Sequence, residues 1–222
     1  MNAFRAACAV AWLGAAPVAA CDLALLLAVD VSGSVDKQEY RTQMDGLAAA
    51  LRDGIVADAL VAQRAQVALV QWTGASRQRM TLQWTDMGSY AQVLEFADRI
   101  AEDPRVWRNY STAIGEALSI ARAAFQDVPH CARKVIDVSG DGVSNEGIAP
   151  DTQRAAMNAA GIIVNALAIE TDSTDLTAYF FENLITGPGA FVVTANGFED
   201  YPEQIRRKLQ RETTKQAVDL FR

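Results

Sequence analysis

Three short segments of the chain carry carboxylate or hydroxyl side chains next to glycine. Asp30, Ser32 and Ser34 alternate along the first segment, Thr112 lies in the second, and Asp141 in the third is followed by glycine. Two carboxylates and three hydroxyls, completed by water, match the all-oxygen shell that small divalent cations accept. The pattern predicts a site for one Mg²⁺ ion, with Mn²⁺ or Ca²⁺ as alternatives.

Each segment alone also has a plainer interpretation. Aspartate and serine before a helix commonly cap its free N–H groups, and Thr112 at the start of a predicted helix can do the same. Asp141 and the glycine after it form a common turn dipeptide. All three segments nevertheless fall where an α/β sheet places its ligand, which favours one shared site over capping alone.

The elements that must position these residues alternate along the chain. Short apolar runs predict strands over residues 23–29, 67–72, 79–84, 134–139, 162–169 and 190–194. Helical spacing of apolar residues predicts helices over residues 36–52, 89–102, 112–125, 151–160, 176–185 and 201–221. This alternation predicts a single Rossmann-like α/β domain over residues 21–222, with helices on both faces of an open, mostly parallel sheet. The strands over residues 67–72 and 79–84 are joined by a short turn and form a hairpin, which supplies one antiparallel edge strand.

Charge and composition exclude several classes of protein. Aspartate and glutamate number 27 against 20 lysines and arginines, which gives a net charge of −7. Nucleic-acid binders need a clustered basic face, so we expect no nucleic-acid partner, and binding to anionic lipid is disfavoured as well. One histidine and three cysteines leave little for a zinc site or an imidazole-based triad.

The first twenty residues resemble a signal peptide. Arg5 precedes an alanine-rich apolar stretch, and Val18 and Ala20 suit the −3 and −1 positions of a signal-peptidase site. Cleavage before Cys21 would leave 19 basic and 27 acidic residues, a net charge of −8. We therefore expect a periplasmic or secreted protein. We also expect no membrane span in the mature chain, because no stretch of it approaches the roughly 20 apolar residues that a span needs.

Two cysteines remain after that cleavage. Cys21 and Cys131 form an even pair, which in an oxidising compartment is a candidate disulfide. Residues 18–21, Val-Ala-Ala-Cys, also look like a bacterial lipobox, which would make Cys21 a lipid-anchored N-terminus. Free thiols are the third alternative.

The candidate ligands together resemble the metal-ion-dependent adhesion site (MIDAS) of von Willebrand factor type A (vWA) domains. A group of exported bacterial proteins with such domains is similar as well, through Trp72-Thr73-Gly74 and the run over residues 136–142. The resemblance covers nearly the whole mature chain. It implies that Ser32, Ser34 and Thr112 bind the cation directly or nearly so, that Asp30 and Asp141 bind it directly or through water, and that one position stays open. The Ser-Gly pair before Asp141 departs from the Thr or hydrophobic residue of better-known members.

The resemblance also bears on the cysteines. Its sheet order places the first and fourth strands side by side and parallel. Cys21 lies nine residues before Asp30, and Cys131 lies ten residues before Asp141. If the two aspartates share one end of neighbouring strands, the two cysteines share the other, which favours the disulfide.

The function implied by the resemblance is that of an exported, non-enzymatic protein-binding module, which captures an acidic group of a partner protein through the cation. Trp107, Arg108, Glu170 and Asp172 are candidate rim residues for that partner, although each also fits an ordinary surface loop. The alternative is a metal-dependent hydrolase acting on a phosphate or ester. No Gly-x-Ser-x-Gly motif or P-loop supports that alternative.

Overall fold

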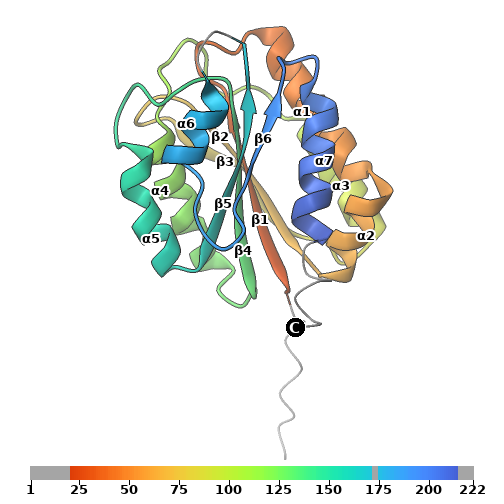
Figure 1. Cartoon of the computed structure of the whole chain (residues 1–222). Coiled ribbons are helices and arrows are strands. Elements are labelled where there is room, and N and C mark those ends of the chain that lie inside the picture. The colour runs from red at the N-terminus through yellow and green to blue at the C-terminus, as the bar shows by residue number, and fades with distance from the viewer. Residues whose placement is uncertain (1–20, 172–174, 215–222) are drawn as a thin grey trace, which may run out of the picture.

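Six strands form one sheet in the order β3-β2-β1-β4-β5-β6 (Figure 1). The structure is a computed structural model, which describes residues 21–171 and 175–214. Every neighbouring pair is parallel except β2 and β3, which run antiparallel. The strands are β1 (Leu23–Asp30), β2 (Gln66–Trp72), β3 (Gln78–Asp86), β4 (Arg133–Gly140), β5 (Ile162–Ile169) and β6 (Val192–Ala195). The predicted fold class, including the antiparallel edge strand, is confirmed. Residues 1–20, Asp172 and the last residues of the predicted terminal helix lie outside the described residues.

Helices cover both faces of this sheet. Helices α1, α2, α3 and α7 lie on one face and α4, α5 and α6 on the other (Figure 1). Their bounds are α1 (Lys37–Arg52), α2 (Gly54–Ala62), α3 (Tyr90–Glu102), α4 (Ile114–Ala124), α5 (Arg154–Ala159), α6 (Leu176–Asn183) and α7 (Tyr201–Thr214). Among these helices none combines the length and apolarity needed to cross a membrane.

Strand β1 is apolar throughout because both of its faces are buried. Leu25 and Leu27 pack into the core beneath α1, α3 and α7, whereas Leu26 and Ala28 pack into the core beneath α4. Burying a leucine side chain is worth roughly 1.5–3 kcal/mol. The continuous run of the sequence thus reflects a central parallel strand, which holds its last residue, Asp30, in a fixed position.

Three local features differ from the sequence-based expectation. Helix α2 was not predicted, because its residues are apolar nearly all round and lack the contrast that marks an amphipathic helix. The predicted helix over residues 151–160 divides into a 3₁₀ turn (Pro150–Gln153) and the short α5. Helix α4 begins at Ile114, two residues after Thr112.

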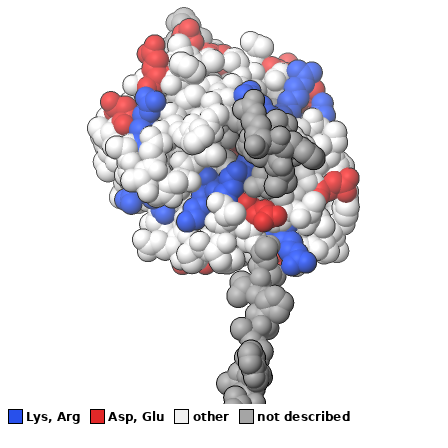
Figure 2. All heavy atoms as spheres, turned by 60° about the horizontal axis from the view of Figure 1, so that its bottom comes forward, with Lys and Arg blue, Asp and Glu red and all other residues white. Residues whose placement is uncertain are grey.

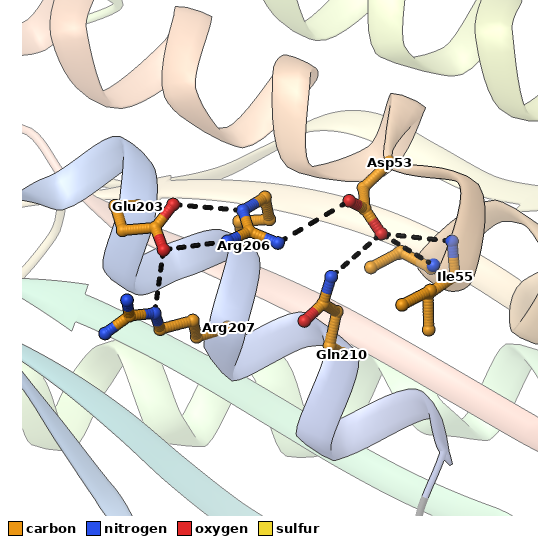
Figure 3. Close-up of polar contacts among 7 residues, drawn as sticks. Asp53, Ile55, Glu203, Arg206, Arg207 and Gln210 are labelled. Atoms are coloured by element: carbon orange, nitrogen blue, oxygen red, sulfur yellow. Dashed lines mark hydrogen bonds and ion pairs between the residues drawn. The ribbon is translucent and has the colours of Figure 1, made fainter.

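The terminal helix α7 is fastened to the corner between α1 and α2 (Figure 3). Asp53 accepts hydrogen bonds from the backbone N–H of Ile55, at 3.0 Å, and from the Gln210 side chain, also at 3.0 Å. The Arg206 guanidinium lies 3.7 Å from the other oxygen of Asp53 and also pairs with Glu203. These contacts hold the middle of α7 against the corner between α1 and α2.

A buried group of charges joins the sheet to α7. The Lys208 ammonium lies 2.5 Å from Asp137 Oδ1 and 2.8 Å from Glu212 Oε1, and all three side chains are at least 98% buried. Asn165 donates to the same Glu212 oxygen. Burial and the Asp137 carboxylate raise the pKa of Glu212 to about 7. Although burial alone disfavours the ammonium, the two carboxylates raise the pKa of Lys208.

A disulfide joins Cys21 to Cys131 just before β1 and β4 begin, with 4.5 Å between their Cα atoms. The backbone N–H of Ala132 also donates to the Cys21 carbonyl, so the strands are paired from this point on. The bridge uses the thiol that lipidation of Cys21 would need. Figure 2 shows this end of the molecule, on whose visible part small groups of basic and acidic side chains alternate with uncharged ones.

Candidate metal centre

The five predicted ligands meet at the carboxyl ends of the parallel strands, at the top of Figure 1. Ser32 Oγ and Ser34 Oγ are 3.2 Å apart, and the Ser34 hydroxyl donates to Asp141 Oδ1 at 2.7 Å. Asp30 is the last residue of β1, and its Oδ1 accepts the backbone N–H of Ser32 at 2.7 Å. Thr112 Oγ1 borders Gly142, 3.8 Å from where a Cβ on that glycine would stand. Three loops that are distant in sequence therefore meet at this end of the sheet, where Ser34, Thr112 and Asp141 line one pocket.

Helix capping does not account for these oxygens. Helix α1 is capped by Asp36, whose carboxylate accepts the N–H of Glu39, whereas Ser32 and Ser34 lie in the loop before it. The N-cap of α4 is Ala113, which offers no side-chain cap, so Thr112 does not cap that helix either. Hydroxyls that cap nothing, and that lie within reach of a carboxylate, are available to a metal ion.

The buried carboxylate of Asp30 fits a cation. The side chain is fully buried, and its Oδ2 has no hydrogen-bond partner among the residues that the structure describes. Burial and the nearby Asp141 carboxylate raise the pKa of Asp30 to about 8. An anion in this position is unfavourable unless a positive charge balances it. The environment of Asp30 therefore favours a bound proton or a bound cation.

Gly140 provides the room for that carboxylate. A Cβ at this position would stand 3.0 Å from Asp30 Oδ2 and 3.5 Å from the Trp72 ring. The Ser-Gly pair before Asp141, which departs from better-known vWA sequences, thus places a residue without a side chain against the Asp30 carboxylate. The sequence alone shows the departure but not this reason for it, because the contact joins residues that are 110 positions apart.

The loop that holds Ser32 and Ser34 is supported from the segment before α4. Arg105 donates to the carbonyl oxygens of Val31, at 2.9 Å, and Ser32, at 2.8 Å. The N–H of Gly33 donates to the Tyr110 carbonyl at 2.8 Å, and a side chain on Gly33 would come within 3.2 Å of the same oxygen. Arg105 therefore positions the ligand loop without being a ligand itself.

Asn145 supports Thr112 in the same way. Its side-chain oxygen accepts the backbone N–H of Thr112 at 2.9 Å, and its own N–H donates to the Thr112 carbonyl at 2.9 Å. These two bonds tie the second and third ligand segments together. No sequence signal marked Asn145, because an asparagine in a polar loop after a strand is an ordinary turn residue.

A pocket of about 230 Å³ opens over the cluster, with Ser34, Thr112, Asp141 and Glu170 among its lining residues. The Glu170 carboxylate accepts the backbone N–H groups of Leu176 and Thr177, so it serves as an N-terminal cap of α6. Rim residue Glu170 therefore lies at the pocket with its carboxylate already hydrogen-bonded.

The other rim candidates lie apart from that pocket. Trp107 is half-buried against the core beneath α1, α3 and α7, and the Arg79 guanidinium lies 5.6 Å from its ring centroid. Arg108 is exposed and lines a separate hollow on the other side of Gly33. Asp172 lies outside the described residues. Their part in partner binding stays a prediction.

Several solved structures share this fold at low sequence identity. Proximal thread matrix protein 1 from the mussel byssus is 18% identical, with a TM-score of 0.66 over 86% of this chain and 47% of that one. Another structure of that protein carries a zinc-occupied MIDAS motif. The pilus adhesin SpaC from Lactobacillus rhamnosus GG is 12% identical, with a TM-score of 0.63 over 89% of this chain and 31% of that one.

A von Willebrand factor type A protein from Catenulispora acidiphila is 20% identical, with a TM-score of 0.57 over 86% of this chain and 43% of that one. The chain thus spans less than half the length of these proteins, and the likeness shows the vWA fold. No curated protein matches the sequence.

A family match covers all of the described residues. The family is described as "Protein of unknown function (DUF1194)", and the match runs over residues 20–217. The sheet order of this chain, its antiparallel edge strand and its covering helices are those of vWA domains. The chain belongs to the DUF1194 family and has the vWA fold.

Proposed function

We propose that this chain is an exported, non-enzymatic protein-binding module that captures an acidic group of a partner protein through one divalent cation. Mg²⁺ is the proposed ion, with Mn²⁺ or Ca²⁺ as alternatives, and its ligands are Asp30, Ser32, Ser34, Thr112 and Asp141. The observation that carries the proposal is the fully buried Asp30 carboxylate, whose second oxygen lacks a partner among the described residues.

The charges suit capture of an anion. Asp30 and Asp141 together balance one divalent cation, so a further anionic ligand adds only a single negative charge to the site. The pocket of about 230 Å³ beside Ser34 and Asp141 is large enough for a carboxylate and open to solvent. The zinc-occupied MIDAS motif of the mussel protein and the adhesin SpaC support a binding role for this fold.

Binding is favoured over hydrolysis by what surrounds the pocket. Hydrolysis at a metal requires a base that can take a proton from a bound water. Among the described residues that line the pocket, Glu170 is the one further acid besides Asp141, and its oxygens already accept hydrogen bonds from Leu176 and Thr177. His130 lies beside Cys131, at the opposite end of the sheet. A phosphatase and esterase screen in Mg²⁺ addresses the hydrolase alternative.

The test is affinity capture from the native envelope, with the mature chain as bait, in Mg²⁺ and in chelator. Capture in Mg²⁺ should be lost in chelator and in Asp141→Ala. Asp127→Ala is the matched control, because Asp127 is an exposed aspartate at the opposite end of the sheet from the site. Capture that survives both chelator and Asp141→Ala would overturn the metal bridge.

A second measurement separates bridging from a purely structural cation. If the ion only stabilises the loops, Asp141→Ala lowers the melting temperature but leaves partner capture intact. Export is tested separately by mass spectrometry of the envelope protein, where cleavage is expected to place Cys21 at the N-terminus. A mature chain that retains residues 1–20 would contradict that expectation.

A further inference from the structure

A second pocket adjoins the metal loop and differs from the one over the metal ligands. It measures about 390 Å³ and lies between the N-terminal part of α1 and residues 103–109. Gly33, which separates the two serine ligands, forms part of its wall. The charged residues that line it are Lys37, Arg41, Arg105 and Arg108 on the basic side, and Asp36, Glu102 and Asp103 on the acidic side.

Two of the three acids are already committed to hydrogen bonds. Asp36 accepts the backbone N–H of Glu39 at 2.8 Å as part of a capping box, and Asp103 Oδ2 accepts from Gln71 and Thr81. Only Glu102, an exposed residue at the end of α3, has no such bond among the described residues. The acids therefore offset the basic residues less than their number suggests.

Three of the four basic residues lack a carboxylate partner. Arg41 is paired with Asp45, but Lys37, Arg105 and Arg108 form no ion pair within residues 21–171 and 175–214. The like charges of these basic residues line one pocket and repel one another, and an anion placed between them relieves the repulsion.

Arg105 also has an unused donor. Its Nη2 group is taken up by the carbonyl oxygens of Val31 and Ser32, whereas its buried Nε–H has no acceptor among the described residues. A buried N–H without an acceptor is costly. Guanidinium groups bind carboxylates through such N–H groups with good geometry.

The wall that carries these arginines is held in place by Gln71. The Gln71 amide donates to Asp103 Oδ2 and to the Pro104 carbonyl, and its oxygen accepts the N–H of Val106. Tyr40 adds a hydrogen bond from its hydroxyl to the Asp103 carbonyl. A fixed wall lowers the entropic cost of binding a ligand.

We propose that this pocket binds a second acidic group of the partner, a carboxylate held by Arg105 and Arg108 with Lys37 beside it. The inference rests on the proposed function, since the first carboxylate of the same partner binds the cation. Because Gly33 lines the pocket and Ser32 and Ser34 face the metal, the two sites meet at one residue. The preferred partner segment therefore carries two acidic side chains a few residues apart.

The test uses capped synthetic peptides on the Mg²⁺-loaded mature chain. One peptide carries a single aspartate in a Gly/Ser background, and the others carry two aspartates separated by zero to four residues. Isothermal titration should show at least tenfold tighter binding for two aspartates at one preferred spacing. Arg108→Gln should remove that advantage, so that two aspartates bind no more tightly than one at any spacing. Arg122→Gln, an exposed arginine on α4, is the matched control and should keep the advantage.

A second arm needs no metal. In chelator, acetate titrated into ¹⁵N-labelled protein should shift the side-chain Nε–H signals of Arg105 and Arg108 to saturation, and the Arg122 signal should stay in place. If no peptide binds in Mg²⁺ but acetate shifts these signals, the proposed function fails and the anion pocket stands.

The reverse result is equally decisive. If the single-aspartate peptide binds in a Mg²⁺-dependent manner while no spacing gives an advantage and acetate shifts neither arginine, the metal bridge stands and this inference is overturned. An advantage that persists in Arg108→Gln also overturns it.

Discussion

Replacing Asp30 by asparagine should stabilise the metal-free protein at neutral pH and destabilise it relative to wild type once the metal is added. The substitution keeps the shape of the side chain and the acceptor for the Ser32 N–H, but it removes the ionisable group. Metal affinity would be lost with that group. The opposite signs with and without metal make this variant a direct test of why the carboxylate is buried.

The magnitude follows from the pKa of about 8 for Asp30, against an ordinary value of 3.8. Between those two pH values the folded protein holds a proton that the unfolded chain releases. Its stability therefore falls by about 1.4 kcal/mol per pH unit as pH rises. The accumulated loss from this group reaches about 4 kcal/mol at pH 7. Asparagine avoids that loss but buries an amide N–H without an acceptor, at a cost of about 1–3 kcal/mol.

Urea unfolding of both proteins in chelator at pH 5, 6, 7 and 8 measures the difference. The variant should be the more stable protein by about 1–3 kcal/mol at pH 7, and the two stabilities should cross at about pH 4.5–6. Mg²⁺ at a thousand times its dissociation constant should add about 4.1 kcal/mol to wild type only, which exceeds the advantage of the variant. Because the ion competes with the proton, Mg²⁺ affinity should also rise with pH up to about 8.

Parallel stability curves in chelator would refute the reasoning. They would mean that Asp30 is ionised in the folded protein at pH 5, as an exposed aspartate is. Equal stabilisation of both proteins by Mg²⁺ would show that the ion binds elsewhere.

Three further perturbations test other parts of the structure by urea unfolding. Replacing Cys21 and Cys131 by alanine removes a bridge across 110 residues. The free energy of unfolding should fall by about 4–5 kcal/mol while Mg²⁺ affinity stays unchanged. A loss below about 1 kcal/mol would contradict the loop-entropy argument. Lys208→Met leaves two buried carboxylates without their cation and should lower the free energy of unfolding by about 3–5 kcal/mol, so an unchanged value would show that the pair is solvated. Gly115→Ala places a Cβ 2.1 Å from the backbone oxygen of Ile148. It should lower the free energy of unfolding by about 2 kcal/mol or more and weaken Mg²⁺ binding. Gly54→Ala is the control and should change neither quantity, because nothing lies within 4 Å of a Cβ at that position.

The sequence predicts the fold and the grouping of ligands well because both follow from simple rules. Apolar runs such as that of β1 identify central strands, and the carboxyl ends of parallel strands lie at one edge of a sheet. The same rule predicts that Asp30, Thr112 and Asp141 lie together at that edge. The disulfide between Cys21 and Cys131 is favoured by the sheet order that the resemblance to vWA domains implies, and the structure contains it.

The supporting residues could not be predicted because their roles depend on contacts between distant loops. Arg105 binds backbone carbonyl oxygens 73 and 74 residues away, and Asn145 binds the backbone of Thr112, 33 residues away. Neither contact leaves a periodic or local pattern in the sequence. Helix α2 was missed for a different reason, since its residues are apolar without a clear period.

The two buried aspartates of the central strands show how position decides what an acid does. Asp137 lies inside β4, where no ion from solution can reach it, and the chain supplies a cation in Lys208, 2.5 Å away. Asp30 is just as buried but ends β1, and it forms no ion pair with any described lysine or arginine. The nearest guanidinium group, that of Arg105, is held by carbonyl oxygens of the ligand loop. A carboxyl group that the fold buries at the end of a central strand, and leaves without a protein cation, must either hold a proton or be balanced by a cation from solution.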